Sequence, residues 1–81
     1  MDSKYSNQLK QFGERIKEMR NEDSLTQAEL SERVGINKRT LQRIEAGEIA
    51  AGLNTVIGLA TAFNIGLSEL LKDINLTPSK K

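Results

Sequence analysis

The chain has 81 residues, and we expect one domain with a small core and no separate ligand-sensing domain. It contains no cysteine and no histidine, which excludes disulfides, the usual zinc sites and histidine-based catalysis. Lysine and arginine number 12 against 11 acidic residues, so the net charge of +1 does not by itself indicate a polyanionic partner. No catalytic spacing, phosphate-binding glycine loop or membrane-length apolar run is present, and we expect no enzyme, no membrane protein, no metal and no cofactor.

The first seven residues are short and polar, and we expect residues 1–7 to form a flexible N-terminal arm. Apolar side chains then recur at spacings of three and four residues, at Leu9, Phe12, Ile16 and Met19. This spacing places them on one face of a helix. The sequence therefore predicts that the folded domain covers residues 8–71 and opens with a helix whose apolar face lies in the core.

A second helix is predicted from the residues that would start and end it. Thr26 and Glu29 have the spacing of a capping box, so the helix should begin at Gln27. Gly35 can adopt the positive φ that ends a helix without steric cost. The apolar positions between these ends, all expected to be buried, are Ala28, Leu30 and Val34.

A third helix is predicted over residues 38–45, because Asn37 can cap it with its side-chain oxygen. Leu41 and Ile44 fall on its inward side, with Thr40 beside them. The outward side carries long hydrogen-bonding side chains and no acid: Lys38, Arg39, Gln42 and Arg43. Residues 37–43 thus contribute three positive charges that nothing is expected to neutralise.

The remaining helices have weaker signals. Asn54 can cap a fourth helix, and Ser68 with Glu69 can open a short fifth that contains Leu70 and Leu71. The apolar positions expected to be buried are Val56, Ile57, Ala60 and Phe63 on the fourth helix and Leu70 and Leu71 on the fifth. Residues 72–81 show no periodicity and are predicted to be a tail.

Two helices joined by a short turn with a glycine have the layout of a helix-turn-helix, whose second helix projects from the surface. The outward side chains of that helix suit base edges in the major groove of DNA, since arginine can fork onto guanine and glutamine can pair with adenine. A charge run taken alone is more often a solvated helix face. The helix-turn-helix context favours the nucleic-acid interpretation over that alternative.

Four segments carry a resemblance to a known family. They are Leu25-Thr-Gln-Ala-Glu-Leu, Val34-Gly-Ile, Thr40-Leu-Gln-Arg-Ile-Glu-Ala-Gly and the run from Leu59 to Leu71. Through them, residues 12–71 resemble the phage repressor and Cro-type helix-turn-helix proteins, often called the XRE family. The resemblance implies an all-α fold, a compact lambda-repressor-like bundle of five helices, that binds operator DNA, usually as a two-fold dimer.

The resemblance also implies roles for individual residues. Gln27 resembles a family glutamine that hydrogen-bonds a backbone phosphate and braces the reading helix. Without the motif, Gln27 would be interpreted as an ordinary surface amide. Further phosphate contacts are expected at Thr26, Thr40 and Arg20. The expected base-reading residues are Asn37, Lys38, Arg39, Gln42 and Arg43, with Arg39 and Arg43 the strongest candidates.

Arg20 and Glu45 occupy positions at which family members often form an ion pair. Such a pair would fix the reading helix against the first helix. The alternatives are an exposed pair worth about 0 to 1 kcal/mol and no contact at all.

The chain departs from the family after Gly47, where many relatives carry basic residues and a proline and this chain reads Glu48-Ile-Ala-Ala-Gly. We therefore expect DNA affinity to depend less steeply on salt than in a relative with a basic loop. Apolar side chains in this loop and in the segment around the fifth helix could face a second subunit or pack on the chain's own core. The candidate dimer surface consists of Ile49, Ile65, Leu67, Ile74 and Leu76.

Three functions are compatible with these observations. The leading one is a sequence-specific transcriptional regulator, and we expect a repressor rather than an activator. The family resemblance suggests a bacterial or phage origin and action in the cytoplasm. As a homodimer, the regulator would insert helix 38–45 into the major groove of double-stranded DNA at a palindromic operator. The second is an antitoxin that represses its own operon and binds a toxin partner through residues 72–81. The third, suggested by the acidic loop at Glu48, is a protein interaction module of the same fold.

Overall fold

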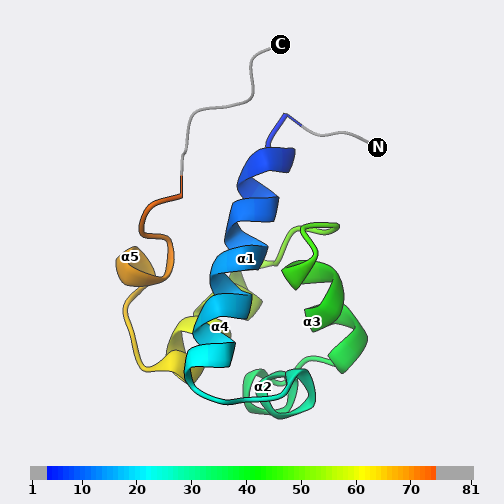
Figure 1. The fold of residues 1–81 in the computed structure, drawn as a ribbon, viewed down its shortest axis with the longest axis vertical. Coiled ribbons are helices and arrows are strands. Elements are labelled where there is room, and N and C mark those ends of the chain that lie inside the picture. Colours follow the sequence, from blue (N-terminus) through cyan, green and yellow to red (C-terminus); the bar gives the residue numbers. More distant parts are fainter. Residues whose placement is uncertain (1–3, 75–81) are drawn as a thin grey trace.

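The computed structural model describes residues 4–74, which contain five helices and no strand. The helices are α1 (Ser6–Glu22), α2 (Gln27–Val34), α3 (Lys38–Glu45), α4 (Leu53–Phe63) and α5 (Leu67–Leu70) (Figure 1). The prediction of an all-α five-helix bundle is confirmed. None of the helices in this described part is long and apolar enough to cross a membrane.

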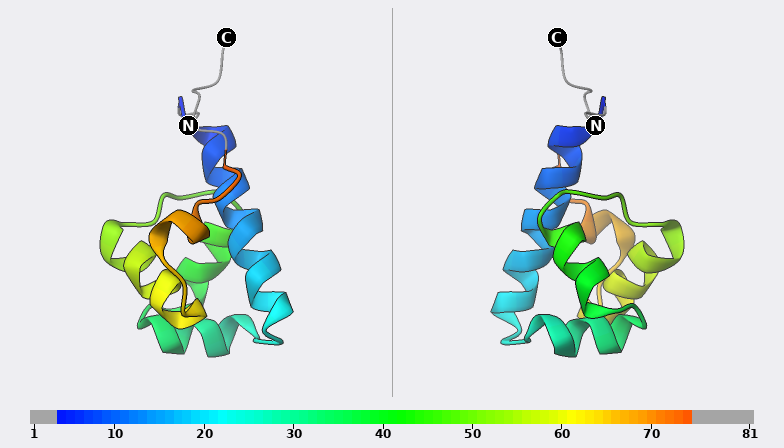
Figure 2. Two further views of the ribbon diagram at one scale, coloured as in Figure 1. Left: turned by 90° about the vertical axis from the view of Figure 1, so that its left-hand side faces the viewer. Right: turned by 90° about the vertical axis from the view of Figure 1, so that its right-hand side faces the viewer.

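The long α1 forms the spine of the molecule, with α3 and α5 on opposite sides of it (Figure 1). α2 lies crosswise to α1 at one end of the bundle (Figure 2). α1 begins at Ser6, and its first turn is closed by the hydrogen bond from the Leu9 N–H to the Tyr5 carbonyl at 3.0 Å. The prediction of an arm over residues 1–7 is therefore wrong for residues 6 and 7, because the helix extends before its first apolar residue.

Each of the five helices contributes at least one fully buried side chain to the interior. These side chains are Ile16, Leu30, Leu41, Ile44, Leu59 and Leu70. Burying a side chain of this size contributes about 1.5 to 3 kcal/mol. The core thus depends on all five helices together, which fixes the position of α3 relative to the rest of the bundle.

Three residues predicted to be buried are exposed. Ala28 lies on the outer side of α2, Ile57 is 45% exposed on α4, and Leu71, directly after α5, is 42% exposed. These predictions took the apolar character of the side chain as evidence of burial. On short helices only the face that meets a neighbouring helix is covered, and apolar residues outside it stay in solvent.

The predicted starts of α4 and α5 are each displaced. The Gly52 carbonyl accepts the first helical hydrogen bond of α4, from the Val56 N–H at 3.0 Å, so Gly52 is the cap and Asn54 lies inside the helix. Gly66 plays the same part for α5, and its carbonyl accepts from the Leu70 N–H at 3.1 Å. Neither helix has a side-chain cap. The side-chain signal at Asn54 was therefore misleading, because a glycine carbonyl in extended backbone supplies the start.

Candidate nucleic-acid interface

Local hydrogen bonds set the turn between α2 and α3. The Thr26 hydroxyl accepts from the Glu29 N–H at 3.0 Å while the Glu29 carboxylate accepts from the Thr26 N–H at 2.8 Å, so the predicted capping box is confirmed. Gly35 ends α2 with φ +90°, as predicted. The N–H groups of Gly35 and Ile36 both donate to the Ser31 carbonyl, at 2.8 and 3.0 Å. The turn geometry is therefore specified by residues within and next to the turn.

Asn37 starts α3 as predicted. Its side-chain oxygen accepts from the Thr40 N–H and from the Thr40 hydroxyl, both at 2.9 Å. Leu41 and Ile44 are buried, which turns the opposite side of the helix to solvent. The exposed side chains on that side are Lys38, Arg39, Gln42 and Arg43, in the orientation that the periodicity predicts.

Glu45, the last residue of α3, accepts hydrogen bonds from two other helices. Arg20 of α1 binds it in bidentate fashion, with Nε to Oε2 at 2.7 Å and Nη2 to Oε1 at 3.1 Å. The Gln27 amide of α2 donates to the same Oε1 at 3.1 Å. The side chains of Arg20 and Glu45 are only 11% and 4% exposed, so the pair is not the weak surface contact that the sequence left open.

The same network reaches the outward side of α3. The Gln27 side-chain oxygen accepts from the Gln42 amide at 3.3 Å, so Gln27 links Glu45 to a residue of the exposed side. Arg20 also donates from Nη1 to the Leu25 carbonyl at 2.9 Å, which ties the loop before α2 into the cluster. Side chains of α1 and α2 thus fix the rotation of α3 and the direction of its exposed side.

α1 and α3 pack closely at Gly13, which the sequence analysis did not identify. A Cβ at this position would lie 2.5 Å from the Glu45 carbonyl oxygen and would also meet the Ile44 carbonyl. Only a glycine allows the backbone of α3 to come this close. The signal available in the sequence was a glycine one residue after Phe12, in the middle of an otherwise regular helical pattern.

Comparisons with known proteins decide the family. A family model described as Helix-turn-helix matches residues 16–70. An uncharacterized HTH-type transcriptional regulator of Archaeoglobus fulgidus is 34% identical over 56 residues, which are 69% of this chain and 79% of that protein. The chain belongs to the helix-turn-helix family of the phage repressor and Cro type, or XRE family.

Solved structures of the helix-turn-helix family superpose on this fold. The restriction-modification controller protein C.AhdI from Aeromonas hydrophila is 29% identical, with a TM-score of 0.79 over 84% of this chain and 99% of that chain. The DNA-binding domain of the P22 C2 repressor is 27% identical, with a TM-score of 0.72 over 82% of this chain and 88% of that chain. The protein is a transcriptional regulator with a helix-turn-helix DNA-binding domain, and the family is not enzymatic.

In this helix-turn-helix protein one positive charge of α3 has an acidic neighbour that the sequence analysis missed. Arg43 Nε lies 3.6 Å from Glu48 Oε1, and both side chains are exposed. The expectation that nothing neutralises residues 37–43 is therefore wrong for Arg43. It considered only the acids within the segment, whereas the chain folds back after α3 and brings Glu48 beside the last turn.

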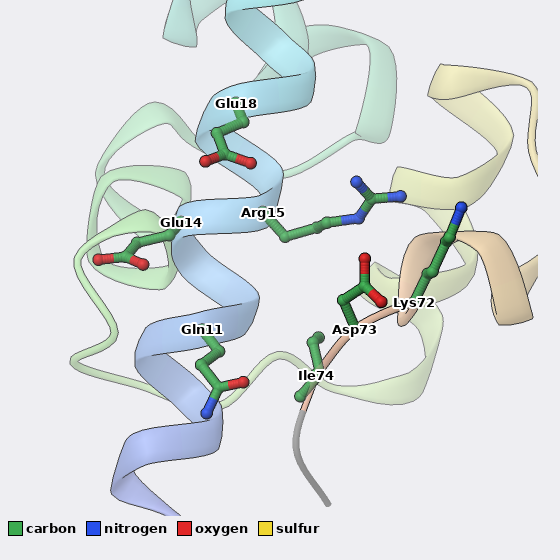
Figure 3. A pocket seen from close by; sticks show the side chains of 7 residues that line it. All are labelled: Gln11, Glu14, Arg15, Glu18, Lys72, Asp73 and Ile74. Carbon is green, nitrogen blue, oxygen red and sulfur yellow. The ribbon is translucent and has the colours of Figure 1, made fainter.

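A polar pocket of about 210 Å³ lies on the side of α1 that faces the segment after α5, away from α3 (Figure 3). Its lining includes Gln11, Glu14, Glu18 and Asp73 together with Arg15 and Lys72. The Arg15 guanidinium donates to two backbone carbonyls of α5, Glu69 at 2.7 Å and Leu70 at 3.2 Å. It therefore fastens α5 to α1, and we assign no ligand to this pocket.

Proposed function

We propose that this regulator is a repressor that binds a palindromic operator as a homodimer and inserts α3 into the major groove. The observation that carries the proposal is the outward side of α3, which carries long cationic and amide side chains on a helix whose orientation is fixed by the network at Glu45. A reading helix needs this rigidity, because base recognition depends on positioning side chains to within about 0.5 Å. Such a regulator acts where the DNA is, in the cytoplasm.

The proposed base contacts follow from the donors on α3. Arg39 and Arg43 can each fork onto the O6 and N7 atoms of a guanine, and Lys38 can reach the same acceptors as a point charge. Gln42 can pair with adenine. Asn37 uses its oxygen for the helix cap, which leaves its amide NH₂ group to donate to a base edge.

The proposed phosphate contacts lie at the other edge of the motif. Gln27 and Thr26 stand at the N-terminus of α2, where the helix dipole favours an anion. Thr40 and Arg20 complete the set. Because Arg20 already binds Glu45 and the Leu25 carbonyl, a phosphate near it would meet a guanidinium that is fixed before DNA arrives.

We propose that the dimer surface centres on an apolar patch formed by Leu53, Ile57 and Leu71. These are exposed to 69%, 45% and 42%, and Leu53 and Leu71 border a groove of about 420 Å³. Other lining residues of this groove are Leu9, Phe12, Val56 and Ile74. A second copy is the occupant that a palindromic operator calls for, because two copies related by a two-fold axis can read successive major grooves about 34 Å apart.

The patch shares no residue with the dimer surface predicted from the sequence, and among the described members of that predicted set only Ile74 lines the neighbouring groove. Leu67 is exposed at 42%, whereas Ile49, Ile65 and Ile74 are half-buried. Leu76 lies outside the described residues. The sequence analysis missed Leu53, Ile57 and Leu71, because it assigned the last two to buried faces and gave Leu53 no role.

Selection of duplexes from a random library tests the proposal. We expect the wild-type protein to enrich a palindromic sequence. The Arg39→Ala and Arg43→Ala variants should each lose about 1 to 3 kcal/mol of binding free energy and show a relaxed preference at one base pair. Lys72→Ala removes the same charge at the polar pocket beside α1 (Figure 3) and should leave affinity and preference nearly unchanged. Retained affinity and preference in the Arg39→Ala, Arg43→Ala double variant would contradict the assignment of α3 as the reading helix.

A further inference from the structure

One stripe of the surface of α1 borders α3. Gly13 lies against the backbone at the end of α3, and Arg20 binds the Glu45 carboxylate, so these contacts establish which side of α1 faces α3. Lys10 and Lys17 belong to the same stripe, because positions 10, 13, 17 and 20 are successively three or four residues apart. The side of α1 next to the reading helix therefore carries a row of cations.

Lys10 lies beside the end of α3. A Cβ added at Gly47 would lie 2.7 Å from the Lys10 Cγ and 2.8 Å from the Lys10 Cα, so the stem of Lys10 covers this glycine. Gly47 is itself held by the hydrogen bond from its N–H to the Ile44 carbonyl at 3.0 Å. The stem that carries the Lys10 ammonium is therefore packed next to the last turn of α3.

Lys10 and Lys17 are exposed, and within residues 4–74 neither forms an ion pair. Glu14 and Glu18, the acids that follow them on α1, line the polar pocket away from α3 (Figure 3). A row of cations on a helix is most often only a solvated face, but this row borders the surface proposed to read DNA. Both charges are therefore available to a polyanion that approaches α3.

We propose that Lys10 and Lys17 bind backbone phosphates of the DNA whose major groove receives α3. The inference rests on the proposed function, in which Arg20 of the same stripe contacts a phosphate. The major groove is about 12 Å wide and a helix with its side chains about 10 to 12 Å across, so the elements beside α3 face the sugar-phosphate backbone. From Arg20 to Lys10 the stripe is about 15 Å long, a length over which one strand of B-form DNA carries several phosphates.

The two lysines supply the cations that the loop after α3 lacks. That loop contains Glu48 and no lysine or arginine before α4 begins. Lys10 contacts the same loop from α1, at Gly47. Two phosphate contacts from α1 add about 1.8 to the magnitude of the slope of log K against log salt.

The Lys10→Gln and Lys17→Gln variants test this, because glutamine keeps the helix and much of the stem and removes the charge. We expect each to bind the selected operator and a duplex of unrelated sequence about three- to tenfold more weakly at about 0.1 M salt. The slope of log K against log salt should fall in magnitude by about 0.9 in each single variant and by about 1.8 in the double variant. The ratio of the two affinities should stay the same, because phosphate contacts carry no sequence information.

Lys72→Gln is the matched control, since it removes the same charge at the polar pocket away from α3 and should leave both slopes unchanged (Figure 3). Lys10→Arg and Lys17→Arg keep the charge and should keep the slope. The urea midpoint should be the same in all these variants, because the substituted side chains are exposed.

Other outcomes overturn the proposal. An equal fall in slope for Lys72→Gln would reduce the lysines to a general effect of net charge, and a loss confined to the operator would make them base readers. Weaker binding with a lower urea midpoint and an unchanged slope would assign them to the stability of α3. If the wild-type protein bound no duplex, the proposed function would fail together with this inference. If the wild-type protein selected an operator and the double variant kept its slope, this inference alone would fail.

Discussion

At the scale of single residues, the position of α3 depends most on Glu45. Its carboxylate is almost completely buried, and every hydrogen bond described for it comes from Arg20 or Gln27. A buried ion pair is not by itself a source of stability, because two charges have been taken out of water. The pair instead fixes an orientation. The planar guanidinium can donate two hydrogen bonds to the Glu45 carboxylate only when the end of α3 lies in one arrangement.

Arg20→Met should destabilise the fold strongly, because it leaves the Glu45 carboxylate buried without its cation. We expect a loss of about 3 to 5 kcal/mol in the free energy of unfolding, measured by urea denaturation. The double variant Arg20→Met, Glu45→Met should recover much of this loss, since no buried charge then remains. Its affinity for the operator should stay low even so, because α3 is no longer oriented. A double variant as unstable as the single one would argue against a desolvated pair.

Glu29 makes the stability of α2 depend on pH. The hydrogen bond from the Thr26 backbone, and then that with the Thr26 side chain, hold the pKa of Glu29 below its ordinary value of 4.5. Because the folded-state pKa is the lower one, the unfolded chain binds the proton first, and the stabilisation is present above pH 4.5 and lost as pH falls through the folded pKa.

Thermal melts between about pH 6 and about pH 3 check this dependence. The wild-type protein should lose melting temperature over the acid end of this range, and Glu29→Gln, which keeps a capping side chain without a titrating group, should lose less. Parallel curves for the two proteins would show that the capping carboxylate does not contribute to the pH dependence.

At the scale of the elements, the sequence predicted α2, the turn and α3 correctly, because local chemistry specifies them. Thr26, Gly35 and Asn37 each bind atoms no more than four residues away, so their roles can be recognised from spacing alone. The start of α4 could not be recognised in this way, because Gly52 offers only a carbonyl. The links from Gln27 to Glu45 and to Gln42 span 18 and 15 residues. The resemblance implied that Gln27 braces the reading helix, but the partners became visible only in the folded chain.

Gly13→Ala tests the contact between α1 and α3. In an isolated helix this change would be favourable by about 1 kcal/mol, but here the new methyl group meets backbone carbonyls that cannot rotate away. We expect a loss of about 1 to 3 kcal/mol or more in stability, together with weaker operator binding, since α3 must shift.

Gly66→Ala is the control for this substitution. The position has open space and a φ of −80°, and the loss of the better cap is offset by the lower entropy of the unfolded chain, so we expect a change of less than about 0.5 kcal/mol. Equal effects of the two substitutions would contradict a special contact at Gly13.

At the scale of the whole molecule, the fold separates the surface proposed to read DNA from the surface proposed to join two copies. α3 presents charged and amide side chains, while Leu53 and Leu71 present apolar ones beside the groove that α1 and α4 help to line. The sequence predicted the first surface because a helical period and a charge pattern coincide there. The second surface is built from residues 18 positions apart, and no local period connects them.

Leu53→Lys tests whether the apolar patch joins two copies. The side chain is 69% exposed, so the substitution should change the stability of the single domain by less than about 0.5 kcal/mol. A lysine on each copy would place like charges in a two-fold interface, where each faces its counterpart or lies near it. We expect sedimentation to show monomers at concentrations at which the wild-type protein is dimeric, and affinity for the full palindrome to fall.

A duplex that carries a single half-site serves as the internal control, because one reading helix suffices there and its affinity should be unchanged. Loss of binding to the half-site as well would place Leu53 in the DNA contact or the fold, and an unaltered dimer would place the interface elsewhere.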